Sequence, residues 1–134
     1  MTTDCVVLIT IEEAVHLHAM VVTRFGGASG VRDIKLLESA LDQPLKVIEY
    51  GEESEKQLEY LAATYFFHVI KNHAFVDGNK RTGLLVTITF LSRNGFALMM
   101  DHESLYNLAI QTAESKIQKH EIAMILKSCI MKMP

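Results

Sequence analysis

Residues 60–91 read YLAATYFFHVIKNHAFVDGNKRTGLLVTITFL, and this stretch places a polar run between two apolar segments. Residues 60–70 and 84–91 are apolar on nearly every side of a helix, which is typical of helices at the centre of a domain. The run between them, residues 73–83, contains a histidine, an aspartate, an asparagine and two cations. Buried polar groups cost free energy unless each finds a partner, so folding alone gives little reason for this composition. The stretch therefore predicts two central helices that flank a functional loop.

The N-terminal half predicts two more helices and an extended segment. Residues 10–13 form a capping box, and apolar residues at helical spacing follow until the glycine pair 26–27. Asp33 can cap a short second helix, which we expect Pro44 to end. Residues 45–53 contain β-branched and aromatic residues, so we expect an extended flap or short hairpin there.

The C-terminal half continues the helical pattern. Residues 54–57, Ser-Glu-Lys-Gln, form a second capping box that would open the first central helix and let it run to about Asn72. Asn94 and the glycine after it would end the second central helix. Asp101 is expected to cap another helix. Apolar residues at helical spacing over 122–130 predict the last helix.

Length and composition favour one folded domain. We expect residues 1–134 to form a single all-α domain of about six helices, with the flap or hairpin before the central pair. The formal net charge of −3 disfavours nucleic-acid binding, because a phosphate backbone meets no general attraction. Cys5 and Cys129 form no metal-binding pair and are expected to act as small buried hydrophobes in a reducing cytoplasm. The N-terminus lacks a basic flank and a long apolar run, so we expect neither a signal peptide nor a membrane span.

The polar run would end at the N-terminus of the second central helix, which is a potential anion site. Unpaired N–H groups and the positive end of the helix dipole meet there. Gly78 lets the backbone approach a ligand closely, and Asn79 tolerates the dihedral angles of a turn. Lys80 and Arg81 place positive charge in the first helical turn, where the dipole disfavours it, and a bound polyphosphate would remove that conflict.

Two further residues of the run suggest transfer chemistry. Asp77 offers a hard carboxylate oxygen of the kind that Mg²⁺ uses when it also binds phosphates. His73 can accept a proton from a hydroxyl near neutral pH. A base, a metal ligand and an anion site within one short run are the parts needed for phosphoryl or nucleotidyl transfer.

The same residues also have an ordinary structural interpretation. His73 could cap the end of a helix, Asp77 could serve as a turn residue and N-cap, and the two cations could be solvated. Short motifs match by chance, so spacing alone leaves both interpretations open. His68 lies on an apolar face and is expected to be a satisfied core residue. The other histidines show no metal-ligand pairing, and they are His16, His18, His102 and His120.

The run His73-Ala-Phe-Val-Asp-Gly-Asn-Lys-Arg81 resembles the signature H-x-F-x-[DE]-[GA]-N-K-R of the Fic/Doc superfamily, specifically of its death-on-curing branch. The similarity extends to R-F-G-G at 24–27, R-D-I-K-L-L-E-S-A-L at 32–41 and F-L-S-R-N-G at 90–95. The resemblance implies an all-α fold and a cytoplasmic toxin of a type II toxin–antitoxin pair. It also implies a Mg²⁺-dependent transfer from ATP or another nucleoside triphosphate to a hydroxyl of a target protein, for which a translation elongation factor is one candidate.

The same resemblance assigns roles to the motif residues. It implies that His73 is the general base, that Asp77 holds the metal and that Phe75 anchors the loop in the core. Arg81 is expected to take part in catalysis. The residues expected at the phosphates follow Asp77 directly, and they are Gly78, Asn79, Lys80 and Arg81.

Two departures from the nucleotidyl-transferring Fic pattern bear on the type of reaction. That pattern continues as G-N-G-R-x-x-R, whereas Lys80 stands here for the second glycine and Leu84 for the second arginine. Death-on-curing proteins share these changes, and the resemblance implies that they transfer the terminal phosphate of ATP. Gly78 keeps the sequence compatible with either mode. A protein nucleotidyltransferase and a catalytically silent partner-binding module are therefore the alternatives.

The sequence lacks a feature by which many Fic proteins restrain themselves, a helix carrying [ST]-x-x-x-E-[GN]. The glutamate of that helix pairs with the second motif arginine. No serine or threonine of this chain is followed four residues later by glutamate, and Leu84 replaces the arginine. The resemblance therefore implies restraint by a separate antitoxin chain, whose C-terminal segment would fold as an amphipathic helix in a groove.

Overall fold

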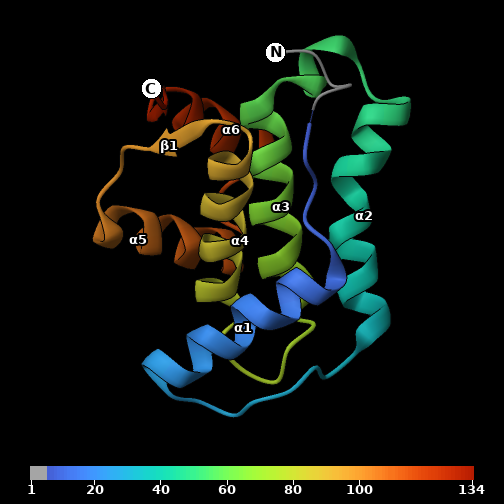
Figure 1. Ribbon diagram of the computed structural model, residues 1–134, viewed down its shortest axis with the longest axis vertical. Coiled ribbons are helices and arrows are strands. Elements are labelled where there is room, and N and C mark those ends of the chain that lie inside the picture. Colours follow the sequence, from blue (N-terminus) through green and yellow to red (C-terminus); the bar gives the residue numbers. More distant parts are fainter. Residues whose placement is uncertain (1–5) are drawn as a thin grey trace.

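The computed structural model describes residues 6–134, and helices account for most of that range (Figure 1). Its elements in chain order are α1 (Ile11–Phe25), α2 (Ile34–Tyr50), the 3₁₀ helix η2 (Glu53–Lys56), α3 (Leu58–Asn72), α4 (Asn79–Arg93), β1 (Phe96–Leu98), α5 (His102–Ala113), α6 (Lys119–Lys127) and β2 (Ile130–Lys132). The predicted all-α class with about six helices is confirmed.

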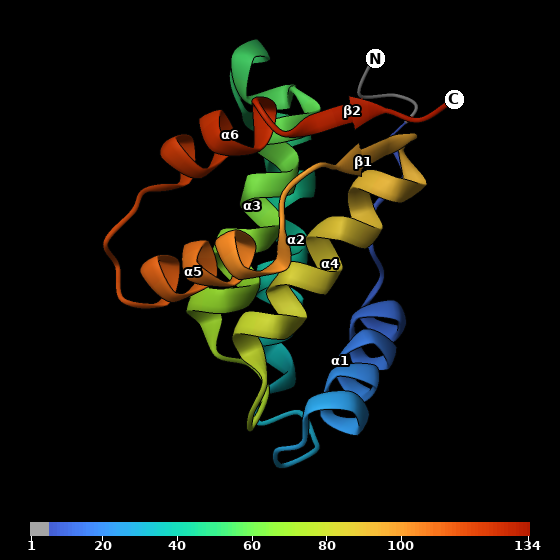
Figure 2. The same cartoon turned by 90° about the vertical axis from the view of Figure 1, so that its left-hand side faces the viewer.

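The two apolar segments form α3 and α4, which lie side by side at the centre of the molecule (Figures 1 and 2). They approach closely at Gly83, where a Cβ atom would lie 2.6 Å from Cγ1 of Ile70. Farther along, the fully buried rings of Tyr65 and Phe90 pack with their centroids 4.9 Å apart. Burying each ring stabilises the fold by roughly 2 to 3 kcal/mol. This packing holds both ends of the loop between the two helices.

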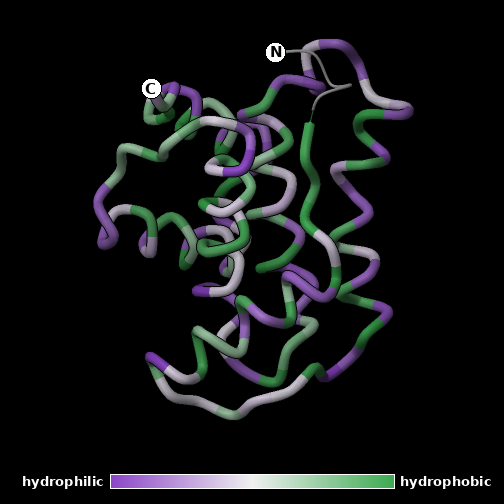
Figure 3. Tube along the Cα trace, in the orientation of Figure 1, coloured by the Kyte–Doolittle hydropathy of each residue, from purple (hydrophilic) through white to green (hydrophobic). Residues whose placement is uncertain are grey.

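The other helices cover the central pair. α2 and α6 pack against α3, whereas α1 packs against α4 and α5 packs against both (Figure 2). Residues 6–9 form an extended hydrophobic segment beside α2 and α3 (Figure 3). The N–H of Ile9 donates to the hydroxyl of Tyr65 at 2.9 Å, and burial raises the pKa of that hydroxyl to about 12. The hydrophobic core therefore includes side chains from the first described residues, since Ile9 is buried in it and Val6 packs against it.

The first two helices begin at the residues that the sequence predicts. Thr10 Oγ1 accepts from the N–H of Glu13 at 3.2 Å, and the Glu13 carboxylate accepts from the N–H of Thr10 at 3.0 Å. Asp33 Oδ1 accepts from the N–H groups of Lys35 and Leu36. Each cap contributes about 1 kcal/mol. The predicted cap at Asp101 and the end of α4 before Asn94 are confirmed as well.

The flap predicted for residues 45–53 is wrong, because Pro44 does not end α2. The helix continues through the proline to Tyr50, and η2 follows. A proline inside a helix costs about 3 kcal/mol. Here it belongs to a buried stripe that packs toward α3, formed by Leu37, Ala40, Leu41 and Pro44. Burial of this stripe offsets the lost backbone hydrogen bond.

Two boundaries in the C-terminal half also differ from the prediction. Residues 53–56 form η2, whose capping box joins Glu52 and Glu55, so α3 begins only after Gln57 and not from the predicted box at 54–57. The last helix ends at Lys127, and the chain then enters β2. β2 pairs antiparallel with β1, so a small sheet follows the central pair and none precedes it among residues 6–134.

Between residues 6 and 134, no helix combines the length and apolar character needed to cross a membrane. Cys129 is a free thiol that is only partly buried. Its predicted role as a buried hydrophobe is therefore only partly met, and Cys5 lies outside the described residues.

Candidate active site

The polar run forms the loop that joins α3 to α4. His73 ends α3 in the left-handed conformation with φ of 54°, and Gly78 precedes α4 with φ of 78°. Left-handed backbone is uncommon outside glycine and is enriched at Asn, Asp and His. The loop thus begins and ends at residues suited to this conformation.

Phe75 and Asn79 anchor the interior of the loop. The Phe75 ring is fully buried. Asn79 Oδ1 accepts from the N–H of Phe75 at 3.1 Å, and Asn79 Nδ2 donates to the carbonyl of Phe75 at 3.1 Å. Asn79 is only 6% exposed, so loss of either bond would leave a buried polar group unsatisfied. The Asn79 side chain is used by the loop itself, which leaves its backbone N–H for a ligand.

The loop between α3 and α4, residues 73–78, is here named the motif loop. A second loop, residues 26–33, runs along it at the lower end of the molecule in Figure 1. Val31 and Phe75 form an antiparallel bridge. The carbonyl of Ala74 accepts from the N–H of Arg32 at 2.8 Å. The backbone of the motif loop is therefore held from one side by a short piece of strand-like pairing.

A cavity of about 280 Å³, here named the motif cavity, opens between these loops, the end of α1 and α5. Its lining residues are Val21, Phe25, Gly26, Gly27, Asp77, Gly78, Asn79, Lys80, Arg81 and Tyr106. All predicted site residues except His73 are among them. The structure thus brings the predicted metal ligand and the predicted phosphate-binding residues to one place.

The Asp77 carboxylate is oriented by backbone donors. Oδ1 accepts from the N–H of Gly78 at 3.1 Å, and Oδ2 accepts from the N–H of Ala28 at 3.3 Å. Gly27 permits this approach, because a Cβ atom there would lie 2.9 Å from Oδ2. None of the ion pairs seen among residues 6–134 involves Asp77. The Asp77 carboxylate therefore faces the cavity, and none of these ion pairs neutralises its charge.

The first turn of α4 presents donors and positive charge to the same cavity. No side chain of the described residues caps this helix, so its first N–H groups can receive an anion. Lys80 lines the cavity. The Arg81 guanidinium lies between two aromatic rings, with Cζ 4.0 Å from the centroid of Phe25 and 4.5 Å from that of Tyr106. Its Nη1 also lies 3.3 Å from Nε2 of His102, so the cation is held at the cavity wall.

His73 is exposed and does not line the motif cavity. Its ring is linked to the other motif residues through Asn79, whose Nδ2 lies 3.4 Å from His73 Nδ1. An amide nitrogen can only donate, so this weak contact favours a ring whose Nδ1 carries no proton. The predicted base therefore lies next to the cavity, and the Asn79 side chain lies between His73 and the cavity.

The donor set of the motif cavity fits Mg²⁺ together with a nucleoside triphosphate. Residues 6–134 contain no cluster of three His, Cys, Asp or Glu side chains that could hold a metal ion alone. Mg²⁺ commonly binds one or two carboxylates together with substrate phosphates. Asp77, next to an uncapped helix N-terminus, supplies that combination. Asp77 would hold the metal, and the first turn of α4 with Lys80 and Arg81 would hold the phosphates.

Two side chains outside the motif touch the motif loop and were not predicted. His18 of α1 is buried, bonds the carbonyl of Asp77 and stacks on Phe75. Arg32 bonds the carbonyl of His73. The signal that could have found His18 is its helical spacing between buried residues of α1, namely Ala14 and Val21.

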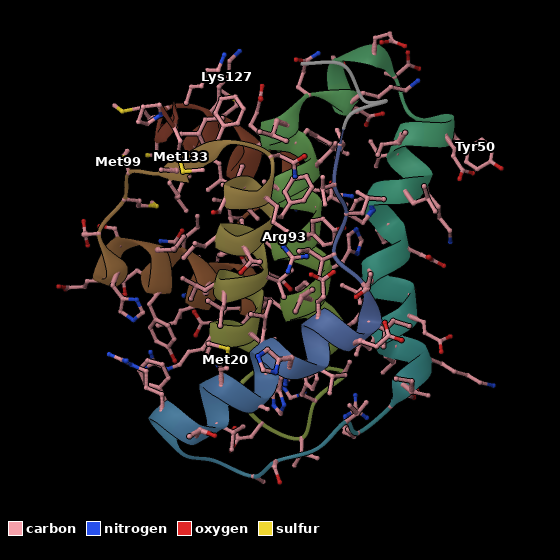
Figure 4. All side chains as sticks on the ribbon, in the orientation of Figure 1. Met20, Tyr50, Arg93, Met99, Lys127 and Met133 are labelled. Atoms are coloured by element: carbon pink, nitrogen blue, oxygen red, sulfur yellow. The ribbon has the colours of Figure 1, made fainter. Side chains whose placement is uncertain are left out.

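A larger cavity of about 710 Å³, here named the α1–α4 groove, lies between α1, α4 and the start of α5. Its lining is mostly apolar and includes Met20, Val21, Phe25, Leu84, Leu85 and Ile88. Met20 is 49% exposed and projects from α1 toward the first turns of α4 (Figure 4). Phe25 and Arg81 line both the groove and the motif cavity, so the two cavities share a wall.

Comparison with known proteins agrees with the motif. Residues 8–91 match the Fic/DOC family. The chain is 31% identical over 116 residues to the protein kinase doc of Escherichia phage P1, a match that covers 87% of this chain and 90% of that protein. It is 40% identical over 79 residues to the toxin Doc of Mycolicibacterium smegmatis, covering 59% of this chain and 60% of that protein. The resemblance read from the sequence is confirmed: the chain belongs to the Fic/DOC family.

Proposed function

We propose that this protein is a toxin that transfers the terminal phosphate of a nucleoside triphosphate, in the presence of Mg²⁺, to a hydroxyl of a target protein. The observation that carries the proposal is the motif cavity, which places a carboxylate beside an uncapped helix N-terminus and two cations. Such a site suits a metal-bound polyphosphate. The names of the two relatives, a protein kinase and a toxin, support the same function.

Each motif residue has a distinct task in this proposal. Asp77 would hold Mg²⁺, which when bound neutralises charge on the phosphates. The N–H groups of Asn79 and Lys80 and the Lys80 ammonium would orient the terminal phosphate. Arg81 would add charge at the phosphates from a position set by contacts of its guanidinium with the rings of Phe25 and Tyr106.

In the transfer, the hydroxyl oxygen of the target forms a bond to the γ-phosphorus while the bond from that phosphorus to the bridging oxygen breaks. The hydroxyl proton moves to Nδ1 of His73, the ring nitrogen that carries no proton, and the electron pair of the broken bond leaves with the nucleoside diphosphate. His73 is exposed and lies outside the motif cavity, which suits a group that meets the target protein.

Leu84 supports phosphoryl rather than nucleotidyl transfer. It stands one helical turn after Lys80 and is buried in the wall of the α1–α4 groove. An arginine at this position would bind the γ-phosphate of a nucleotide that is held in the orientation for nucleotidyl transfer. With an apolar side chain there and Lys80 in the first turn, the terminal phosphate is better placed as the transferred group.

The direct test uses ATP labelled separately at the α and γ positions, incubated with the protein, Mg²⁺ and a bacterial lysate. Label should reach a protein from γ-labelled ATP only, and His73→Ala should transfer none. Transfer of the α label would identify a protein nucleotidyltransferase. Transfer of neither label, with a stable protein complex formed instead, would identify a silent binding module. A translation elongation factor is the first candidate to test as purified target.

The proposed function includes a cytoplasmic antitoxin chain that binds the α1–α4 groove. Its apolar lining suits the apolar face of an amphipathic helix. The groove shares Phe25 and Arg81 with the motif cavity, so a helix bound there would contact the cation proposed to meet the phosphates. Antitoxin binding is therefore expected to hinder nucleotide use.

A further inference from the structure

His18 is a buried histidine of α1 that contacts the motif loop in two ways. It is 3% exposed. Its ring stacks on Phe75 with the centroids 3.9 Å apart and the planes inclined by 7°. Its Nε2 lies 2.8 Å from the carbonyl oxygen of Asp77. A carbonyl oxygen can only accept, so Nε2 carries the proton and donates.

The carbonyl that His18 holds belongs to the same peptide group as the N–H of Gly78. That N–H donates to Oδ1 of Asp77 at 3.1 Å. A chain of hydrogen bonds therefore runs from the His18 ring, through one peptide group, to the Asp77 carboxylate. Each bond in such a chain polarises the next, and this peptide is held at both its oxygen and its nitrogen.

We propose that His18 is a positioning residue for the Mg²⁺–nucleotide site. The proposal rests on the proposed function, since Asp77 is taken to hold the metal. By fixing the peptide between Asp77 and Gly78, His18 orients the carboxylate and aims the N–H groups that follow toward the motif cavity. Outer hydrogen-bond partners of metal ligands typically alter metal affinity or activity about 10- to 100-fold.

If His18 only supports the fold, its stacking on Phe75 should matter and its hydrogen bond should not. Two variants separate these two contacts. His18→Phe keeps a flat ring against Phe75 but has no donor. His18→Gln keeps an N–H donor at the end of its side chain but has no aromatic ring. His120→Phe makes the same change at an exposed histidine of α6 and serves as the control.

The first readout is calorimetric binding of adenylyl imidodiphosphate, a non-hydrolysable ATP analogue, with Mg²⁺, alongside thermal unfolding. His18→Phe should weaken Mg²⁺-dependent binding about 10- to 100-fold, whereas His18→Gln should regain most of the affinity. His120→Phe should bind as the wild type does. Equal affinity of His18→Phe and wild type, or equal losses in both His18 variants, would overturn the proposal. If the wild type itself does not bind the Mg²⁺ complex, the proposed function fails and this inference with it.

The second readout uses the unsubstituted protein and therefore does not depend on how the variants fold. Binding of the Mg²⁺ complex at Asp77 should shift the Nε2 resonance of His18, because the hydrogen-bond chain ends at the carboxylate that binds the metal. The resonances of His120 should not move. An unchanged His18 resonance at saturation with the Mg²⁺ complex would overturn the proposal.

Discussion

Arg32 donates two hydrogen bonds from its guanidinium to the backbone carbonyl of His73, from Nε at 3.0 Å and from Nη2 at 2.6 Å. The accepting carbonyl belongs to the residue that ends α3 in the left-handed conformation. That conformation costs roughly 1 to 2 kcal/mol at a residue with a Cβ atom. Hydrogen bonds from a charged donor are among the stronger ones, so Arg32 helps to hold the backbone of the proposed base.

Replacing His73 tests the base and its backbone conformation together. His73→Gly should abolish phosphate transfer, because no side chain remains to take the proton. It should also raise the free energy of unfolding by up to about 1 kcal/mol, because glycine adopts φ of 54° without steric cost. Transfer of the γ label and urea unfolding measure the two effects. His73→Ala should be inactive without the gain in stability. A His73→Gly protein that transfers phosphate at the wild-type rate would contradict the proposed base.

Asp77→Asn keeps the shape of the side chain but removes its charge. The variant should need at least about tenfold more Mg²⁺ for half-maximal transfer, since a neutral amide oxygen is a weaker ligand for this cation than a carboxylate. The measurement is the transfer rate as a function of Mg²⁺ concentration at saturating ATP. Asp42→Asn, at an exposed position of α2, is the matched control and should leave the curve unchanged. If both variants give the wild-type curve, Asp77 is a turn residue only.

His68 joins α3 to α6 outside the motif cavity. Its Nε2 lies 3.0 Å from Nζ of Lys119, so the histidine is satisfied as predicted, but it is only partly buried and is not a core residue. Burial, and to a smaller extent the charge of Lys119, lowers the pKa of His68 from 6.5 to about 4. The imidazole is therefore neutral in the folded protein at neutral pH and accepts from the lysine.

Stability should consequently fall as the pH drops from about 6.5 to about 4. In that interval the unfolded chain binds a proton at His68 that the folded chain does not, so acid favours unfolding. Urea unfolding at a series of pH values checks this expectation. His68→Leu should flatten that part of the profile, whereas His120→Leu, at an exposed position of α6, should not. An equally steep decline in His68→Leu would assign the acid sensitivity to other groups.

Much of the fold could be predicted because its signals are local. Caps at Thr10, Asp33 and Asp101 mark helix starts, and all-round apolar character marks the central pair. The errors occur where tertiary packing outweighs a local rule. Pro44 is tolerated inside α2 because its ring joins the stripe that packs toward α3, and η2 replaces a predicted cap where Glu52 and Glu55 bond each other instead.

The candidate site could be predicted only where it is contiguous. Residues 77–81 meet at one cavity because a tight loop enters a helix N-terminus there. His18 and Arg32 lie 59 and 41 residues from the atoms they bond, so their roles depend on how α1 and the loop 26–33 pack. The α1–α4 groove likewise arises from two helices far apart in the sequence.

Ile88 offers a test of the antitoxin site with a closely matched control. Ile88 of the α1–α4 groove and Leu45 of α2 are both 39% exposed. If the apolar face of an antitoxin helix covers the groove, Ile88→Asp would place an unpaired charge against it and should weaken binding about 100-fold or more. Leu45→Asp should leave binding unchanged. Both affinities can be measured on the purified pair.

Growth measurements extend this test to the cell. The wild-type protein expressed alone should arrest growth, and a neighbouring small reading frame should relieve the arrest and co-purify with it. Ile88→Asp should still arrest growth but should no longer be relieved, because Ile88 lies outside the motif cavity. Full relief of Ile88→Asp would place the antitoxin on another surface. If the wild type proves harmless alone, yet transfers phosphate at full rate without a partner, the chemistry stands but the toxin role does not, and the protein is a housekeeping modifying enzyme.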